Sequence, residues 1–289
     1  MSETGTAGVP VAHEDVVRAS ARAWEMDRYL SALLSPRPVR DDLIALAAFA
    51  GEIERIPAFV SEPMMGEIRL QWWREALENP DLAIRSGHPV ADAVRATAAR
   101  RRLPMGLLFG FIDAQSTLLH DEPMTDDHAL AMHVAKTEGA LFELALRILG
   151  ATDELTHAAA LAAGQAYGIA RLLVELPAAW AQGRVLIPVS RLSEFGLSLA
   201  QVQAGAPADR LAPVLAGLVE ESRRHLAEAR IYSRRLNRAQ HKAFLPLAVV
   251  EPYLRAFQRG RRDPLREPLE IAPLSRVWAL FRSSVTGRF

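Results

Sequence analysis

Charged side chains on otherwise apolar helical faces are the first candidates for chemistry in this chain. Over residues 60–77 the helical pattern places Arg69 in the middle of an apolar arc that should face the core. On the preceding helical stretch, 40–56, Glu52 also lies within an apolar arc. A buried charge is costly when it is alone, and a hydrogen-bonded ion pair relieves that cost. The pattern therefore predicts a structural ion pair between Glu52 and Arg69.

A second set of polar residues lies on the glycine-rich stretch 153–176. One stripe of this helix carries Gly164, Gly168, Arg171 and Glu175, with Tyr167 at its margin. The rest of the surface is Ala, Leu, Ile and Val, and Arg171 and Glu175 are spaced to pair along the helix. Two interpretations are open. The stripe is a self-satisfied ion pair with glycines that admit a neighbouring helix, or it is the polar wall of a pocket.

Helices must position these side chains, because helical periodicity runs through the chain and is interrupted by Pro, Gly and Asp. The pattern predicts helices over 12–34, 40–56, 62–78, 89–100, 104–117, 125–149, 153–176, 190–194, 198–203, 209–236, 243–258 and 274–285. The only strand-like run is GRVLIP, residues 183–188. The expected fold class is all-α, with a disordered lead-in at 1–14 and a single domain over 15–289.

Composition excludes several kinds of site, and it favours a buried helix over a membrane span. The 289 residues include no Cys, which rules out disulfides, thiolate catalysis and cysteine-bound zinc. The eight His residues are scattered and form no HExxH motif. The longest apolar stretch, 158–181, is interrupted by charges and a proline, which favours a buried helix. The N-terminus shows no signal or transit peptide pattern, so we expect a cytoplasmic protein, at most peripheral on the inner membrane.

The charges are unevenly distributed along the chain. From Arg223 onward there are fifteen Lys and Arg against five Asp and Glu, a net charge of +10, and the remainder carries −10 because the total is zero. One interpretation is complementarity between an acidic and a basic part of the same molecule. The other is contact of the basic third with anionic lipid or an acidic partner. No nucleic-acid-binding motif accompanies the arginines, so nucleic acid is not an expected partner.

The order of these segments resembles the squalene/phytoene synthase family over residues 25–285. The most specific pieces are SEPMMGEIRLQWWREAL and the glycine-rich helix leading into GRVLIP, which is similar to the family's G-R-x-Y-L-P segment. The resemblance implies an isoprenoid-synthase-like helical bundle around a central cavity. It also implies two D-x-x-x-D motifs that bind Mg²⁺, which neutralises the diphosphate of a prenyl substrate as it leaves.

The chain departs from this pattern at both motifs. The two Asp positions are occupied by Glu54 and Ala58 in the first motif and by Glu175 and Ala179 in the second. Arg55 adds a positive charge beside the first, and we expect Pro57 and Pro177 to break the helical turns that would carry the second ligands. With half of the ligands missing, ordinary prenyl condensation is not expected.

The resemblance also implies which residues would act in an enzyme that kept its activity. The remaining metal ligands would be Glu54 and Glu175, with Tyr167 and Arg171 beside them as catalytic residues. Lys136 and Arg184 would contact the diphosphate as charge-assisted donors. No cofactor is expected otherwise, and Mg²⁺ is expected only if the protein is an active enzyme.

The stretch AFAGEIERIPAFVSEPMMGEIRLQWWREAL resembles a divergent branch of the family that includes a mitochondrial respiratory complex I assembly factor. This implies a catalytically degenerate protein that assists the assembly of a membrane respiratory complex, complex I. Its partner would be a respiratory subunit or the inner-membrane surface, met by the basic C-terminal third. Two alternatives stay open: a prenyltransferase with an altered metal site, and an isoprenoid or lipid carrier whose small residues at 162–168 leave space for a ligand.

Overall fold

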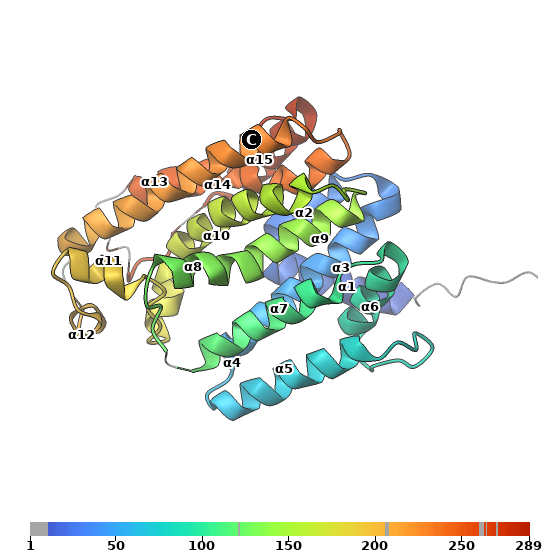
Figure 1. Ribbon diagram of the computed structural model, residues 1–289, viewed down its shortest axis with the longest axis horizontal. Helices are drawn as coiled ribbons and strands as arrows, with labels where there is room; N and C mark the ends of the chain where they lie inside the picture. The colour runs from blue at the N-terminus through green and yellow to red at the C-terminus, as the bar shows by residue number, and fades with distance from the viewer. Residues whose placement is uncertain (1–10, 121, 206–207, 260–262, 264, 270) are drawn as a thin grey trace, which may run out of the picture.

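The computed structural model describes residues 11–289, with the exception of 121, 206–207, 260–262, 264 and 270. All regular structure in these residues is helical, and they contain no β-strand (Figure 1). The expected all-α fold class is confirmed. Residues 1–10 of the expected lead-in lie outside the described residues, whereas 11–14 already belong to the first helix.

The helices follow one another with short connections. The first half of the chain contains α1 (Val11–Trp24), α2 (Met26–Leu33), α3 (Arg37–Glu54), α4 (Ile56–Phe59), α5 (Pro63–Glu78), α6 (Pro89–Arg101), α7 (Met105–Ser116) and η1 (Thr117–Leu119). The second half contains α8 (Asp127–Val134), η2 (Ala135–Gly139), α9 (Ala140–Ile148), α10 (Leu155–Ala181), α11 (Val189–Glu194), α12 (Leu199–Gln203), α13 (Ala208–Ser233), η3 (Gln240–Val249), α14 (Val250–Gln258) and α15 (Pro273–Thr286).

Two of the predicted long helices are interrupted at positions that matter for the site. The predicted helix 12–34 is divided at Glu25, whose φ of −129° and ψ of 55° are not helical. The predicted helix 125–149 contains a π-helical turn, η2, between α8 and α9. A π-turn adds a residue to the turn and changes the direction of the side chains that follow, and such turns are frequent at functional sites. Hydrophobic periodicity alone detects neither interruption.

The structure near the end of α10 differs from the expectation at one residue, Pro177. The strand-like run 183–188 forms no strand, in agreement with the all-α prediction, and begins with a turn at Gly183, whose φ is +75°. Pro177 lies inside α10 and does not end it, since the helix continues to Ala181. The missing N–H of Pro177 costs one helical hydrogen bond, and the buried Leu176 and Ala179 on either side keep the last turns packed on the bundle.

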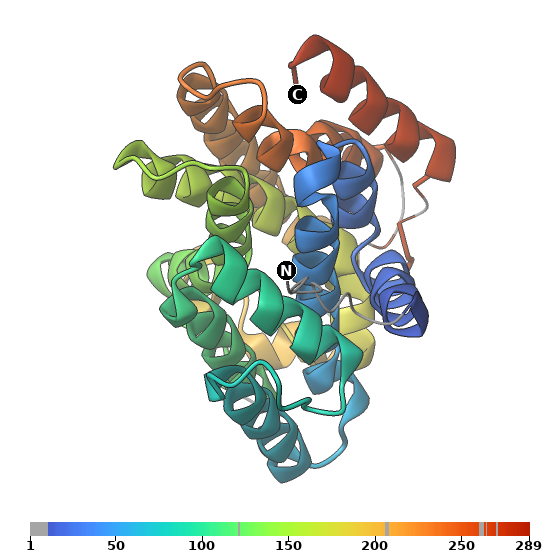
Figure 2. The ribbon, with the colours of Figure 1, turned by 90° about the vertical axis from the view of Figure 1, so that its right-hand side faces the viewer.

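The core consists of two hydrophobic clusters joined across the middle of the bundle. One cluster centres on α10 and α13 and includes η3 and α14, while the other centres on α3 with α6 and α7. Figure 2 shows the bundle end-on to several of these helices, with α15 at its outer edge. No helix among the described residues is long and apolar enough to cross a membrane.

Glycines allow α10 to approach η2 very closely. A Cβ atom on Gly164 would lie 2.5 Å from both the Cα and the N of Gly139, and one on Gly168 would lie 2.7 Å from Val134 Cγ1. These contacts support the interpretation in which the glycines admit a neighbouring helix. They also contradict the expectation that the small residues at 162–168 leave open space, since the neighbouring backbone fills it.

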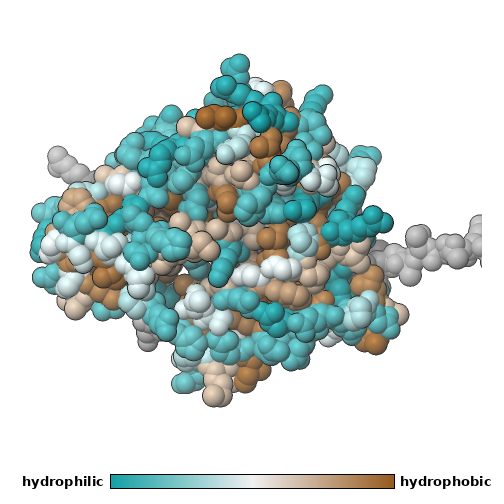
Figure 3. All heavy atoms as spheres, viewed as in Figure 1, coloured by the Kyte–Doolittle hydropathy of each residue, from teal (hydrophilic) through white to brown (hydrophobic). Residues whose placement is uncertain are grey.

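Helix α5 lies at the edge of the bundle and packs on α4, α6 and α7 (Figure 1). Leu70 and Trp73 are buried there, but Met65 and Ile68 are 49% and 56% exposed. The space-filling view shows hydrophobic residues along the lower edge, over this helix (Figure 3). An edge helix buries only a narrow stripe, so much of the apolar arc that was expected to face the core is in contact with solvent.

The predicted ion pair between Glu52 and Arg69 is wrong. Glu52 Oε2 accepts from Arg55 Nη2 at 2.6 Å, and its Oε1 accepts from Ser20 Oγ at 2.7 Å. Arg69 is exposed, and it has no ion pair in the part of the chain that the structure describes. The reason is geometric: Arg55, directly after the end of α3, is three residues from Glu52 and reaches it along the chain, whereas α5 directs Arg69 to solvent.

Candidate functional site

The side chain of Arg171, from the middle of α10, is surrounded by four carboxylates. Its Nη1 donates to Glu25 Oε1 at 2.8 Å and to Glu138 Oε1 at 2.9 Å. Its Nη2 donates to Glu54 Oε2 at 3.0 Å and to Glu175 Oε1 at 2.9 Å. We call these five residues the arginine cage. The predicted pairing of Arg171 with Glu175 is confirmed, and it is one of four such contacts.

A second arginine, Arg28, binds two carboxylates of the arginine cage. Arg28 Nη1 donates to Glu25 Oε2 at 2.6 Å, and its Nη2 donates to Glu138 Oε2. The guanidinium carbon of Arg28 also lies 5.0 Å from the ring centre of Tyr167, close enough for a cation–π contact. Glu25 and Glu138 are therefore each shared by two arginines, and all four of these hydrogen bonds are charge-assisted.

The two helix interruptions place the carboxylates that the sequence analysis missed. Glu25 stands at the junction between α1 and α2, where the non-helical backbone directs its side chain into the bundle, and the residue is 3% exposed. Glu138 lies in the π-turn η2, directly opposite Gly168 of α10, and is 6% exposed. The only local signal for either residue is the three-residue spacing of Glu25 and Arg28 in an apolar stretch.

The pKa values of two cage carboxylates, Glu25 and Glu54, are shifted in opposite directions. Burial would raise the pKa of Glu25, but the guanidinium groups of Arg171 and Arg28 outweigh it and lower that pKa. Burial raises the pKa of Glu54 well above its ordinary value, and the neighbouring Glu25 and Glu138 raise it further despite Arg171. Glu54 therefore takes up a proton more readily than Glu25 does.

Tyr167 belongs to a neighbouring polar cluster and does not line the cavity. Its hydroxyl donates to Asp27 Oδ2 at 3.0 Å, and the hydroxyl of Tyr253 donates to the same oxygen. Arg276 of α15 pairs with the other oxygen at 3.1 Å. Burial raises the pKa of Tyr167 well above its ordinary value. Tyr167 therefore ties α10 to α2 and α14 and is held as a neutral phenol.

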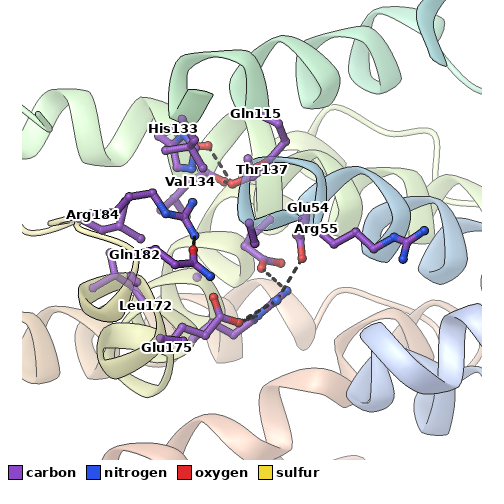
Figure 4. Close-up of a pocket in the computed structure, with 18 of the residues that line it drawn as sticks. Glu54, Arg55, Gln115, His133, Val134, Thr137, Leu172, Glu175, Gln182 and Arg184 are labelled. Atoms are coloured by element: carbon purple, nitrogen blue, oxygen red, sulfur yellow. Dashed lines mark hydrogen bonds and ion pairs between the residues drawn. The ribbon is translucent and has the colours of Figure 1, made fainter. Parts of the chain in front are cut away.

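A cavity of about 310 Å³ opens beside the cage. Figure 4 shows Glu54 and Glu175 directed toward each other across it, Arg184 at its rim reaching toward Gln182, and Arg55 directed away. His133 also lines the cavity, and burial lowers its pKa to about 4, so it is neutral. This volume is at the lower end of the roughly 300–1,000 Å³ typical of small-molecule sites.

The structure brings together only part of the predicted site. Glu54, Glu175, Arg171 and Arg184 all line the cavity, with Arg184 held near the last turn of α10. Lys136 is exposed and is absent from the cavity lining, so its predicted role as a diphosphate contact is wrong. The π-turn explains the difference, because it directs Glu138 inward and leaves Lys136 on the outer side.

The residues around the cavity do not fit a resident Mg²⁺ ion. Mg²⁺ requires free carboxylate oxygens in a near-octahedral arrangement with bound water. Here Glu54 Oε2 and Glu175 Oε1 both accept hydrogen bonds from Arg171 Nη2, so the positive charge of Arg171 occupies the position between the two carboxylates. No group of three or more His, Asp or Glu in the described ranges is arranged to hold a metal ion.

The chain belongs to the squalene/phytoene synthase family, whose model matches residues 21–278. Its fold resembles the crystal structure of squalene synthase HpnC from Alicyclobacillus acidocaldarius, with a TM-score of 0.74 and 21% identity over 87% of this chain and 96% of that one. Together with the geometry, this defines an isoprenoid-synthase-like bundle with an ion-paired centre.

The curated relatives are of two kinds. The chain is 27% identical over 272 residues to NADH dehydrogenase (ubiquinone) complex I, assembly factor 6 of Rattus norvegicus. This alignment covers 93% of this chain and 81% of the relative. It is 26% identical over 205 residues to the phytoene synthase of Mycobacterium tuberculosis (strain ATCC 25618 / H37Rv), which covers 70% of this chain and 66% of that protein. The resemblance to the assembly factor thus extends over more of the chain.

Proposed function

We propose that this protein is a non-catalytic member of its family that assists the assembly of a respiratory membrane complex, complex I. The observation that carries the proposal is the position of the Arg171 guanidinium. It lies between Glu54 and Glu175. The resemblance assigns these two residues to the first Asp positions of the family's metal-binding motifs. A fixed cation in this place neutralises the carboxylates that a Mg²⁺–diphosphate group would need.

The comparison with known proteins supports the same choice. The assembly factor of Rattus norvegicus aligns with 93% of this chain, while the phytoene synthase of Mycobacterium tuberculosis aligns with 70%. We further propose that the partner is a respiratory subunit or the inner-membrane surface, and that the basic C-terminal third makes the contact. The protein would then be cytoplasmic and peripheral on the inner membrane.

The assembly role is tested by deleting the gene in the organism of origin and measuring assembled NADH:quinone oxidoreductase on native gels. We expect the assembled complex to fall severalfold and to recover when the gene is restored. Unchanged levels of the complex would refute the proposal.

The absence of catalysis has a separate test on the purified protein. Millimolar Mg²⁺ with inorganic pyrophosphate should leave the unfolding temperature unchanged, and prenyl diphosphates should not be turned over. A saturable rise in unfolding temperature would reveal binding to the folded state, and turnover that Glu175→Ala abolishes would establish the prenyltransferase alternative. Native mass spectrometry tests the carrier alternative, which predicts that a lipid co-purifies with the protein.

A further inference from the structure

Helix α15 turns its large apolar side chains outward, away from the bundle. They are Leu274, Val277, Trp278, Phe281 and Val285. Leu274 is 83% exposed, Trp278 64% and Val285 68%. At about 100° per residue the five side chains fall within an arc of about 100°, so they form one continuous stripe along the helix. We call this the α15 stripe.

The inner face of the same helix carries the smaller residues. Ala279, Leu280 and Ser283 are buried where α15 packs on η3 and α2. Figure 2 shows α15 at the outer edge of the bundle, next to the C-terminal end of the chain. The helix therefore exposes more apolar volume than it buries. Contiguous exposed patches of this kind mark interaction surfaces in soluble proteins.

The surroundings of the stripe are basic. Residues 273–289 contain three arginines and no Asp or Glu. Arg276 is directed inward and pairs with Asp27, whereas Arg282 and Arg288 are exposed. Within the described residues no carboxylate side chain pairs with either of them. The apolar stripe is thus flanked by positive charge that no carboxylate side chain of the described residues neutralises.

A cavity of about 360 Å³ opens at the C-terminal end of the stripe, between α15 and η3. Its polar lining includes Arg238, His241 and Lys242, and it includes no Asp or Glu side chain. Lys242 Nζ donates to Ser284 O at 2.9 Å and to Ser284 Oγ at 2.8 Å. The main-chain oxygen of Phe289 at the rim is held by Arg230 Nε at 2.6 Å. The side chains that line the cavity therefore include cations and hydroxyl donors, and no carboxylate side chain.

We infer that α15 and this cavity form a docking surface for an anionic phospholipid bilayer. The α15 stripe inserts its Trp and Phe side chains into the interfacial region, and Arg282 and Arg288 meet lipid phosphates beside it. A phosphate group enters the cavity near Arg238 and Lys242. Burial and the charge of Arg238 both lower the pKa of Lys242, which is consistent with a site that gains from an anion.

Charge favours a membrane over a second copy of the chain. Two copies joined through the stripe would bring Arg282 and Arg288 of both copies together without an acid to pair with them. An anionic bilayer instead supplies negative charge and an apolar interior side by side, which matches the stripe and its flanks. The inference rests on the proposed contact through the C-terminal third and is independent of the assembly role.

Co-sedimentation of the full chain with vesicles tests the inference. We expect binding to vesicles of phosphatidylcholine with about one-third phosphatidylglycerol, little binding to pure phosphatidylcholine, and weaker binding at high salt. The double variant Trp278→Ser, Phe281→Ser should lose at least tenfold in affinity. Equal sedimentation of this variant and the wild type would overturn the inference.

The chain offers a matched control for this variant. Trp24 and Phe59 form a similar exposed aromatic pair, with ring centres 5.6 Å apart, compared with 6.1 Å for Trp278 and Phe281. The variant Trp24→Ser, Phe59→Ser should bind vesicles like the wild type. Equal losses in both double variants would indicate non-specific adsorption and would also overturn the inference. Circular dichroism confirms that each variant is folded.

The charge component has its own variants. Arg238→Gln and Arg282→Gln should each weaken binding about fivefold, which corresponds to about 1 kcal/mol per basic residue near an anionic surface. Arg69→Gln, which removes an exposed arginine on α5, should leave binding unchanged.

If the double variant Trp278→Ser, Phe281→Ser instead abolishes a concentration-dependent dimer and vesicles are not bound, a second copy of the chain is the occupant and the inference is overturned. Vesicle binding without any effect of gene deletion on complex I would uphold the docking surface and refute the assembly role.

Discussion

Arg171 of α10 donates through Nη2 to Glu54 Oε2 at the end of α3, at 3.0 Å. This contact joins the two helices that carry the family's metal-binding motifs in the resemblance described above. It also links the two hydrophobic clusters of the core, because α3 belongs to one and α10 to the other. A protein side chain thus provides the positive charge between these helices, and it is present in every folded molecule.

Removing this charge should destabilise the fold strongly. Arg171→Met leaves four carboxylates around an apolar side chain, and loss of one partner from a buried ion-pair network typically costs about 3–5 kcal/mol. Urea denaturation of the variant should show a loss in the free energy of unfolding of this order. Glu175→Gln, at a side chain that is 51% exposed, should cost less than 1 kcal/mol. Equal effects of the two variants would contradict the central role of Arg171.

Glu54→Gln should have an effect that depends on pH. The pKa of Glu54 is raised in the folded state, so protonation of Glu54 favours folding. This contribution is present below the ordinary pKa of a glutamate and is lost as the pH rises through the raised pKa. Gln has no proton to lose, so the variant should gain stability relative to the wild type as the pH rises from the ordinary pKa of a glutamate toward the raised pKa of Glu54. Urea denaturation at several pH values measures the difference.

Glu25→Gln is the control with the opposite sign. The pKa of Glu25 is lowered, so its ionised form stabilises the folded state above the ordinary pKa of a glutamate. That contribution disappears as the pH falls through the lowered pKa. The variant should therefore be less stable than the wild type at neutral pH, and the difference should shrink in acid. Parallel pH profiles for the two variants would refute the opposite pKa shifts.

Arg69→Met should be tolerated with Glu52 intact. Arg69 is exposed, and Glu52 is already paired with Arg55 at 2.6 Å. Surface substitutions of this kind usually change stability by no more than about 0.5 kcal/mol. Thermal unfolding should show no measurable change, whereas Arg55→Met should lower the unfolding temperature slightly. A large loss of stability in Arg69→Met would instead support an ion pair between Glu52 and Arg69, which the structure contradicts.

Gly164→Ala should disrupt the contact between α10 and η2. The added methyl group would lie 2.5 Å from main-chain atoms of Gly139, which have no way to move aside without shifting a helix. Overpacking of this kind costs about 1–3 kcal/mol or more. Gly110→Ala in α7 is the matched control, because nothing lies within 4 Å of the added atom. There Ala should stabilise the helix by about 0.5–1 kcal/mol. We expect the denaturation midpoint to fall for Gly164→Ala and to rise for Gly110→Ala, each relative to the wild type.

The sequence by itself determined the features that depend on local spacing. Helical periodicity predicted most helices, and the four-residue spacing of Arg171 and Glu175 predicted their ion pair, because side chains one turn apart meet on any straight helix. The resemblance carried by the segment SEPMMGEIRLQWWREAL and the glycine-rich helix predicted the family, which the family model confirms. These features need no information about which helices are neighbours.

Only the tertiary structure decided which side chains meet across helices. Glu25 and Glu138 are 146 and 33 residues from Arg171, and their directions depend on a helix junction and a π-turn that periodicity does not reveal. In the same way, the pattern of α5 showed an apolar arc but not that this helix lies at an edge, where Arg69 meets solvent. Periodicity specifies the face of a helix on which a residue lies, and the packing of the whole chain determines what covers that face.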